Sequence, residues 1–500
     1  MDVLHPFQER AIQRLCPGRT ALFLRYGAGK SWIALEYVRQ FINQNPVNDP
    51  YITAIIFCRN HNKLTWQIEL SKRYPNARIL IAPQDIVGNR RVPTTEDKDG
   101  VFILVPHHLI RTLLPTLSWY VTTYNIHALI MDESTAIKNP KAQITTAALK
   151  VSKFAGQNCQ RLILTGRAMP EGPHEIWSQF EFLYPGKNPL GHSYYDFLRR
   201  WFIKTDYGWV LELAQTDVFY AIIRNHSVWL TDQDLVELKE HIGVTREQFI
   251  IEHYEESTEQ RKILNHLYAN WALPTAYISY DGLKTEMEFD LPFDDRSIVD
   301  TTPSEEYLYA LSVQMKAQQI SGGFYYTSNG RSAVTLRQQP KLGLLVEILH
   351  QLLEEKHGRK IIVWHRFDYE RVLIIQALVT AKIVAVIGPD ARMLLEFNRP
   401  SGASVILMPV QISQGFNELV VADTNIFYSN VYSSELREQA EARLKRIGQK
   451  HHVITHIDLA SARQVDIEIV TALQSKAFNL ERLHNTLQRY RKQPQPEKTC

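Results

Sequence analysis

A glycine-rich run near the start of the chain, Gly27-Ala28-Gly29-Lys30-Ser31, contains the residue types that bind nucleotide phosphates. It follows the apolar run 21–24 and precedes 32–36, which we expect to begin a helix. Backbone N–H groups at a glycine turn and a helix N-terminus attract anions, so Lys30 would contact the β- and γ-phosphates and Ser31 would hold Mg²⁺. Because Leu24 stands where the full phosphate-loop motif has its first glycine, a glycine turn with a surface lysine is the alternative.

Two adjacent carboxylates, Asp132 and Glu133, follow the apolar run Leu129-Ile130-Met131. Such a run is typical of a buried strand, which would place both carboxylates at its carboxyl end. There Asp132 would bind Mg²⁺ and Glu133 would polarise the water that attacks the γ-phosphate. An Asp-Glu pair after a strand most often begins an ordinary loop, but the glycine-rich run in the same lobe favours the catalytic interpretation.

A third segment near the other end of the chain, 439–449, places Arg443 and Arg446 three residues apart. On a helix the two side chains would share one face. Guanidinium groups on the γ-phosphate would stabilise the charge of the transition state. A solvated basic helix that includes Lys445 is the alternative. Together the three segments predict one chain that carries both halves of a nucleotide-driven motor.

The elements that would position these residues are short, apolar and rich in β-branched side chains. They lie at 54–57, 78–82, 101–105, 127–131 and 161–164, and again at 360–364, 382–387, 404–408, 425–428 and 453–457. Continuous apolar strands that alternate with helical spacing indicate parallel sheets covered on both faces. We therefore expect an α/β fold with two parallel-sheet lobes, one over 1–190 and one over 340–475.

The middle of the chain, 191–339, is rich in aromatic residues and helix-like stretches, and we expect a mainly helical insertion between the lobes. Within it, 281–300 is acidic and contains proline, which predicts a protruding loop over 272–304. A solvated surface hairpin with no special role is the alternative for this loop. The last residues, 476–500, end in a polar stretch with little apolar content and are expected to form a tail.

Composition is that of an ordinary globular protein, since 45% of the 500 residues are hydrophobic and 22% are charged. A net charge of +3 permits a nucleic-acid partner but does not require one. The four cysteines lack any C-x-x-C pair, which argues against a zinc site or a disulfide framework. We find no signal-peptide pattern and no apolar run of the roughly 18 residues that span a bilayer, so a soluble cytoplasmic protein without a membrane partner is expected.

The order of these segments resembles superfamily-two helicases, and specifically the SNF2-like branch of DNA translocases. The resemblance spans roughly 4–459 and implies two RecA-like lobes. Further segments that resemble the motifs of this family are the glutamine motif at Leu4-His5-Pro6-Phe7-Gln8, the Q-W-x-x-E segment at Thr65-Trp66-Gln67-Ile68-Glu69, motif III at 162–170 with the following Glu175-Ile176-Trp177-Ser178, motif IV at 363–367, motif V at 411–417, and motif VI at Gln439, Arg443 and Arg446.

The resemblance implies an ATP hydrolase that uses ATP and Mg²⁺ and moves along DNA as a helicase or translocase. It implies nucleotide contacts from four further residues, Gln8, Gly415, Asn417 and Gln439. It makes these residues candidates for nucleic-acid contact: Arg59, Asn60, Thr165, Arg167, His365, Arg366 and Ser413. Water-exposed strand-end residues without a function are the alternative for each of them. The aromatic run 324–326 would stack a base or, as we favour, pack in the core.

The sequence departs from the family at two places. Ser134 and Thr135 replace the small residue and the histidine of the usual D-E-[AG]-H motif, which puts the route that couples hydrolysis to nucleic acid in doubt. Arg167 replaces a threonine of motif III. The compact chain resembles the small members encoded by bacteriophages, which implies a monomer in the bacterial host cytoplasm, a role in DNA replication or recombination, and action on forked or branched DNA. A translocase that displaces proteins from duplex DNA and a DNA-binding module with an inactive nucleotide site are the alternatives.

Overall fold

The structure is a computed structural model of the whole chain. It describes residues 4–15, 20–44, 51–88, 100–170, 172–205, 208–270, 314–326, 333–412, 417–431, 433–461, 466–467, 469–471 and 473. These residues form two compact units, one that ends at His241 and one that begins at Ile242. The predicted loop over 272–304 and the predicted tail over 476–500 lie outside the described residues.

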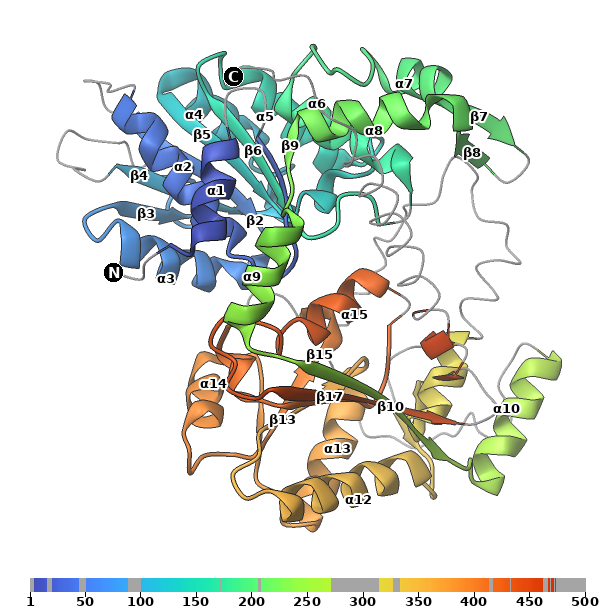
Figure 1. Cartoon of the computed structure of the whole chain (residues 1–500). Helices are drawn as coiled ribbons and strands as arrows, with labels where there is room; N and C mark the ends of the chain where they lie inside the picture. Colours follow the sequence, from blue (N-terminus) through green and yellow to red (C-terminus); the bar gives the residue numbers. More distant parts are fainter. Residues whose placement is uncertain are drawn as a thin grey trace. The chain divides into compact units, whose positions relative to one another are not determined.

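Unit 1 is built on a parallel sheet of seven strands in the order β3-β4-β2-β5-β6-β1-β9 (Figure 1). Its strands are β1 (Ala21–Phe23), β2 (Tyr51–Cys58), β3 (Arg78–Ile81), β4 (Val101–Pro106), β5 (Asn125–Asp132), β6 (Gln160–Thr165) and β9 (Ser227–Val228). Its helices are α1 (Pro6–Arg14), α2 (Lys30–Gln44), α3 (Lys63–Arg73), α4 (Leu114–Thr123), α5 (Gln143–Phe154), α6 (Ile176–Leu183), α7 (Tyr194–Trp201), α8 (Thr216–Asn225) and α9 (Asp232–Ile242). A two-stranded antiparallel hairpin, β7 (Phe202–Thr205) and β8 (Gly208–Leu211), follows α7.

Helices cover both faces of this sheet. Alternate residues of each buried strand point to opposite faces and so pack against different helices. Leu129 and Met131 of β5 belong to a core cluster with residues of α4, α5 and α6. Helices α2 and α3 contact strands of the same sheet and belong to the other layer. Since all seven strands are parallel, the residues that follow β1, β2, β5 and β6 gather at one edge of the sheet. That edge contains the glycine-rich run and the Asp132–Glu133 pair.

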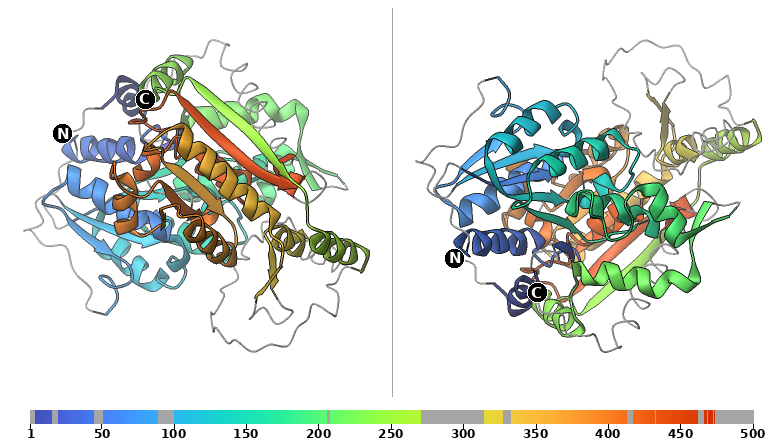
Figure 2. Two further views of the ribbon diagram at one scale, coloured as in Figure 1. Left: turned by 90° about the horizontal axis from the view of Figure 1, so that it is seen from below. Right: turned by 90° about the horizontal axis from the view of Figure 1, so that it is seen from above.

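Unit 2 is built on a second parallel sheet of six strands, in the order β10-β17-β16-β13-β15-β14. Its strands are β10 (Arg246–Tyr254), β13 (Ile361–His365), β14 (Ala385–Ile387), β15 (Val405–Pro409), β16 (Thr424–Phe427) and β17 (Val453–Ser461). Among the described residues, unit 2 also contains a hairpin of β11 (Phe324–Tyr326) and β12 (Ala333–Thr335). Its described helices include α10 (Thr258–Asn270), α12 (Pro340–Glu355), α13 (Asp368–Thr380), α14 (Ala391–Asn398) and α15 (Ser434–Glu441). Figure 2 shows β10 running alongside β17 over their whole length.

The two faces of the second sheet can be followed in strand β13. Ile361 and Val363 pack with residues of α12 and α13, whereas Ile362 and Trp364 pack with residues of α14 and α15. The expected α/β fold with two parallel-sheet lobes is therefore confirmed. In the described part of the chain, no helix combines the length and the apolar character that crossing a membrane would need.

The segment expected to be a mainly helical insertion, 191–339, is shared between the two units. Strand β9 joins the first sheet beside β1, and β10 joins the second sheet beside β17. The division between the units falls after His241, rather than at 190 and 339. Within the described residues, β9 and β10 are each the outermost strand of their sheet.

Candidate ATP-hydrolysis site and nucleic-acid contacts

The glycine-rich run links β1 to α2, as the sequence predicts. Gly27 and Gly29 have φ of 84° and 76°, a left-handed conformation that glycine adopts without strain. Lys30 is the first residue of α2 and is 9% exposed. Its Nζ donates a hydrogen bond to the Leu24 carbonyl at 3.2 Å and lies 4.9 Å from the centre of the Tyr26 ring. The ammonium group is thus held at the turn, next to the N-terminus of a 15-residue helix.

Gln8, expected to contact the adenine base, lies directly against this turn. Its Nε2 donates to the Ala28 carbonyl at 3.2 Å, and its Oε1 accepts from the His5 N–H at 3.0 Å. A Cβ on Gly29 would come within 2.3 Å of Gln8 Nε2. The positive φ of Gly29 strains any other residue at this position. The hydrogen bond from Gln8 to Ala28 ties α1 to the glycine-rich run.

The predicted catalytic pair lies at the carboxyl end of β5. Asp132 is its last residue, and Glu133 follows in a left-handed conformation with φ of 47°. Both carboxylates are buried at 7% exposure. A left-handed conformation costs free energy for a residue other than glycine and is most often kept at functional sites. This conformation ends strand β5 at Asp132 and turns the chain at Glu133.

The structure brings Lys30 and Asp132 together, although 102 positions separate them in the numbering. Burial raises the pKa of the Asp132 carboxyl, and the nearby Lys30 ammonium acts in the opposite direction. Since β5 and β1 lie on either side of β6, both residues belong to the same edge of the sheet. The predicted phosphate-binding lysine and the predicted metal-binding carboxylate therefore lie at the same end of the sheet, as a shared site would require.

Two side chains that contact Asp132 were missed as site residues. Trp66 on α3 is 2% exposed, and its indole Nε1 donates to Asp132 Oδ2 at 2.9 Å. A hydrogen bond from the Asn62 side chain also lowers the pKa of Asp132. The sequence signal for Trp66 is its place in the Q-W-x-x-E segment, but nothing local reveals which carboxylate it holds.

We predict that Trp66→Phe lowers ATP turnover by about tenfold to a hundredfold. Phenylalanine keeps much of the apolar contact but removes the N–H donor, and a hydrogen bond to a charged group contributes about 1.5–3 kcal/mol. Steady-state ATP hydrolysis measures the effect. Trp32→Phe is the matched control for the same substitution at another tryptophan of unit 1. The Trp32 ring packs against Arg73, whose guanidinium carbon lies 4.4 Å from the centre of the ring. Equal turnover in the unchanged protein and Trp66→Phe would contradict the role assigned to the indole.

The residues of the site fit MgATP. A helix N-terminus and a lysine ammonium suit phosphate oxygens, while a carboxylate and the Ser31 hydroxyl are the oxygen donors that Mg²⁺ prefers. Ser31 is the second residue of α2. The charge of the Lys30 ammonium acts to lower the pKa of the Asp132 carboxyl. The described residues contain no cluster of three or more His, Cys, Asp or Glu side chains that would suit a protein-only metal site.

The predicted nucleic-acid contacts of unit 1 differ in accessibility. Arg59 and Asn60 follow β2 at the same edge of the sheet, where Asn60 is exposed and Arg59 is half-buried. Thr165, by contrast, is fully buried, and its Oγ1 accepts from the Arg167 N–H at 3.1 Å. Arg167 is 7% exposed, and its Nη2 donates to the Pro170 carbonyl at 3.0 Å. Thr165 and Arg167 therefore organise the loop after β6 instead of presenting their side chains to solvent.

The predicted nucleic-acid contacts of unit 2 also include both buried and half-buried residues. The His365 ring is 1% exposed, and burial lowers its pKa to about 4, so it is neutral at physiological pH. Arg366 is half-buried, and its guanidinium hydrogen-bonds Gln318. Ser413 and Gly415 lie outside the described residues. Asn417 begins a short 3₁₀ helix that ends at Val421.

The two motif VI arginines do not lie on one helix, which differs from the expectation. Helix α15 ends at Glu441, and the chain continues in turns through Gly448. Arg443 is 2% exposed, and its Nε donates to the Gln439 carbonyl at 3.1 Å. The side chain thereby satisfies a carbonyl in the last turn of the helix, a role that basic residues often take at helix ends. Arg446 is half-buried.

The aromatic run 324–326 packs in the core, as we favoured. Phe324 and Tyr325 are 0% and 1% exposed, and all three residues pair with β12. The Phe324 ring contacts Tyr369 with 5.2 Å between ring centres. The two buried rings are therefore not available as a stacking platform for bases.

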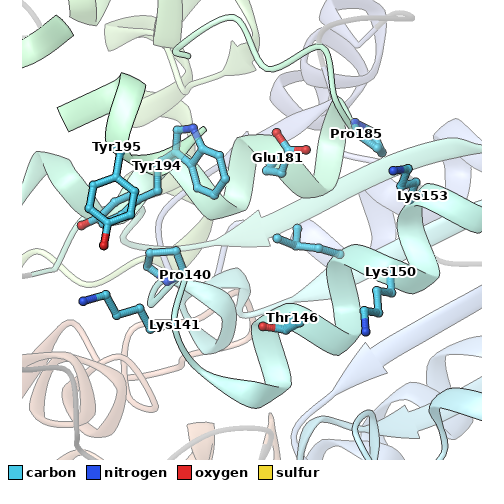
Figure 3. A pocket seen from close by; sticks show the side chains of 11 residues that line it. Pro140, Lys141, Thr146, Lys150, Lys153, Glu181, Pro185, Tyr194 and Tyr195 are labelled. Atoms are coloured by element: carbon cyan, nitrogen blue, oxygen red, sulfur yellow. The ribbon is translucent and has the colours of Figure 1, made fainter. Parts of the chain in front are cut away.

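A groove on unit 1 lies apart from the predicted residues, with a volume of about 460 Å³ (Figure 3). Lys150 and Lys153 on α5 and Lys141 before it line the groove, together with Tyr195 on α7. Glu181 also lines it, and burial raises the pKa of this carboxyl. None of the residues predicted to bind nucleotide or nucleic acid lines this groove.

Residues 30–268 match the sequence profile of the family described as SNF2-related domain. Over this segment the chain is similar to SNF2-related domains. Among curated proteins, an uncharacterized ATP-dependent helicase of Mycoplasma genitalium is 23% identical over 398 residues, which is 78% of this chain and 33% of the relative. Human DNA excision repair protein ERCC-6 is 36% identical over 67 residues, which is 13% of this chain and 4% of the relative. The chain spans no more than about a third of the length of these relatives.

Two solved structures align with most of the chain. The Hef helicase domain of Pyrococcus furiosus aligns with a TM-score of 0.50 at 14% identity, over 94% of this chain and 98% of that one. The SWI2/SNF2 ATPase core of Sulfolobus solfataricus in complex with dsDNA gives 0.42 at 19% identity, over 94% and 90%. At this identity the likeness to the Hef domain shows the fold, which is that of two RecA-like lobes.

Proposed function

We propose that this SNF2-like chain is an ATP hydrolase that couples hydrolysis to movement along DNA. The observation that carries the proposal is the placement of Lys30, at the start of α2 after β1, and of Asp132, the last residue of β5, at the same end of one parallel sheet. The match of residues 30–268 to the SNF2-related domain supports the same activity. Bound Mg²⁺ would supply positive charge that stabilises the transferring phosphoryl group.

Each residue of the site has a role in this proposal. Lys30 binds and orients the phosphates, and Asp132, held by the Trp66 indole, provides an oxygen donor for Mg²⁺. Glu133 accepts a proton from the attacking water or orients it. Arg443 and Arg446 stay predicted as γ-phosphate contacts on the strength of the sequence motif.

DNA is the proposed track. The exposed Asn60 and the neighbouring Arg59 lie after β2, and contacts from such residues to a phosphate backbone would be independent of sequence and sensitive to salt. Burial of Phe324 and Tyr325 removes the aromatic argument for a strand-separating pin. Translocation along duplex DNA is thus the simpler version of the proposal, and unwinding of forked or branched DNA is the more specific one.

Steady-state ATP hydrolysis tests the proposal when measured without nucleic acid and with single-stranded DNA, duplex DNA, a DNA fork or RNA. We expect DNA to stimulate turnover. Equal stimulation by duplex and fork would favour duplex translocation, whereas the greatest stimulation by the fork would favour unwinding. Absence of hydrolysis under every condition would contradict the proposal and support a DNA-binding module with an inactive nucleotide site.

A further inference from the structure

The groove on unit 1 has one wall that is formed by a single face of helix α5. Thr146, Leu149, Lys150 and Lys153 line the groove, and their spacing of three, four and seven positions places them in one stripe along the helix. The opposite face of α5 packs in the core of unit 1. The stripe therefore joins two exposed lysines to a half-buried leucine in one continuous surface.

Positive charge predominates in this groove. Lys141, which precedes α5, is exposed like Lys150 and Lys153, and Glu181 is the one acidic residue among the described residues that line the groove. Within the described part of the chain, no ion pair to Lys150 or Lys153 is found. Complementary charge favours binding and speeds encounter between partners, so the ligand that this groove fits is an anion.

The other wall of the groove is aromatic. Trp177 on α6 is 8% exposed, and its Nε1 donates to the Gly191 carbonyl at 3.0 Å, which fixes the indole. The Tyr194 ring contacts it with 5.8 Å between ring centres, and Tyr195 is 63% exposed. Figure 3 shows Tyr194 and Tyr195 on the opposite side of the groove from Lys150. This wall offers ring surface to an apolar side chain of the ligand.

An extended peptide with alternating acidic and apolar residues matches both walls. Successive side chains of an extended chain point to opposite sides, so the acidic residues would face the lysines and the apolar residues would face the rings. Acidic side chains two positions apart are separated by about 6.6 Å, and Lys150 and Lys153 by about 4.5 Å along the helix axis, which flexible lysine side chains can match. The volume of about 460 Å³ lies within the range of ligand pockets.

A nucleic-acid strand matches the groove less well. Glu181 would repel a phosphate backbone, whereas a peptide carries charge only on its side chains and offers N–H donors that a carboxylate accepts. No arginine is among the described residues that line the groove, although arginine is the side chain that binds phosphate in a bidentate manner. The apolar residues Leu149, Pro140 and Pro185 also favour a ligand with apolar side chains.

We propose that the groove between α5, α6 and the start of α7 binds an extended acidic peptide segment of a partner protein, in which acidic and apolar residues alternate. This inference goes beyond the proposed function and does not depend on ATP hydrolysis. Because none of the residues predicted to bind nucleotide or nucleic acid lines the groove, peptide binding and ATP hydrolysis should be separable.

The test measures binding to the full chain by fluorescence anisotropy. The probe is a labelled peptide of alternating Asp and Leu, about eight residues long, which spans about 26 Å when extended. One comparison peptide has Lys in place of Asp, and another has Ser in place of Leu. We expect each to bind about tenfold more weakly than the probe, because one loses the ion pairs and the other loses apolar burial. Oligodeoxythymidylate of the same number of residues is the nucleic-acid probe.

Substitutions in the groove assign the binding to this surface. We expect Lys150→Ala and Lys153→Ala each to weaken peptide binding about two- to fivefold, and the double variant about tenfold. Tyr195→Ala should weaken it about three- to tenfold through loss of ring contact. Lys72→Ala is the matched control, because Lys72 is an exposed lysine on α3 in the other helical layer. All of these side chains are exposed, so melting temperature and basal ATP turnover should stay unchanged.

Three results would overturn the inference. They are no saturable binding of the Asp-Leu peptide, equal binding by the unchanged protein and the double lysine variant, and loss of oligodeoxythymidylate binding in that variant while peptide binding is unchanged. The last result would make the groove a nucleic-acid surface. A chain that binds the peptide but hydrolyses no ATP would overturn the proposed function and leave this inference standing.

Discussion

Replacing Lys30 with alanine should abolish ATP hydrolysis, with turnover lowered about a thousandfold. The ammonium group is the positive charge that the structure holds at the glycine-rich run, and alanine leaves no group there to reach the phosphates. The same charge lowers the pKa of Asp132, so its removal also raises the cost of ionising that buried carboxylate. Both effects act on the same site. Steady-state hydrolysis and nucleotide binding by equilibrium titration measure them.

DNA binding should stay within a few-fold in Lys30→Ala, because the predicted nucleic-acid contacts are other residues. Lys72→Ala is the control for loss of one positive charge, since Lys72 is exposed on α3. We expect it to hydrolyse ATP at the rate of the unchanged protein. Normal hydrolysis by Lys30→Ala would overturn the assignment of the site. An equal loss of DNA binding would show that Lys30 serves the nucleic-acid interface as well.

The strands that position this site could be predicted from the sequence because they are buried on both faces. In strand β5, for example, residues 128–131 form a continuous apolar run up to Asp132, and the central position of this strand in the sheet requires that pattern. Strand β10 gives no such signal. It contains Arg246, Glu247 and Glu252, and most of its residues are exposed or half-buried. The sequence of such an edge strand is polar, so it was not recognised. The region was expected to be mainly helical because of its aromatic residues and helix-like stretches.

The candidate site could be predicted only where its chemistry is local in sequence. Lys30 and Asp132 each stand in a motif that follows an apolar run. Trp66 does not, because its role comes from a contact with Asp132, which is 66 positions away. Burial of Thr165 and His365 could not be predicted either, since both stand at strand ends that look exposed in the sequence. Tertiary packing, rather than spacing, decides what these three side chains contact.

Replacing Glu133 with glutamine should lower ATP turnover by about a hundredfold to ten-thousandfold while ATP binding is retained. Glutamine keeps the size of the side chain, so the buried turn after β5 and its contacts to α6 can form. It cannot accept a proton from the attacking water, because the carboxylate is gone. Lys30, the proposed phosphate contact, and Asp132, the proposed Mg²⁺ ligand, are unchanged in this variant. The expected result is therefore a protein that binds ATP and does not hydrolyse it.

The comparison of Glu133→Gln with Lys30→Ala separates the two halves of the site. Lys30→Ala should lose phosphate contacts, whereas Glu133→Gln should keep bound ATP and affect only the chemical step. Glu36→Gln is the matched control for the amide substitution, since Glu36 on α2 pairs with Arg39. A Glu133→Gln protein that loses ATP binding would assign Glu133 to the structure of the turn. One that keeps normal turnover would move the general base to another residue and leave the left-handed conformation at Glu133 as a structural feature.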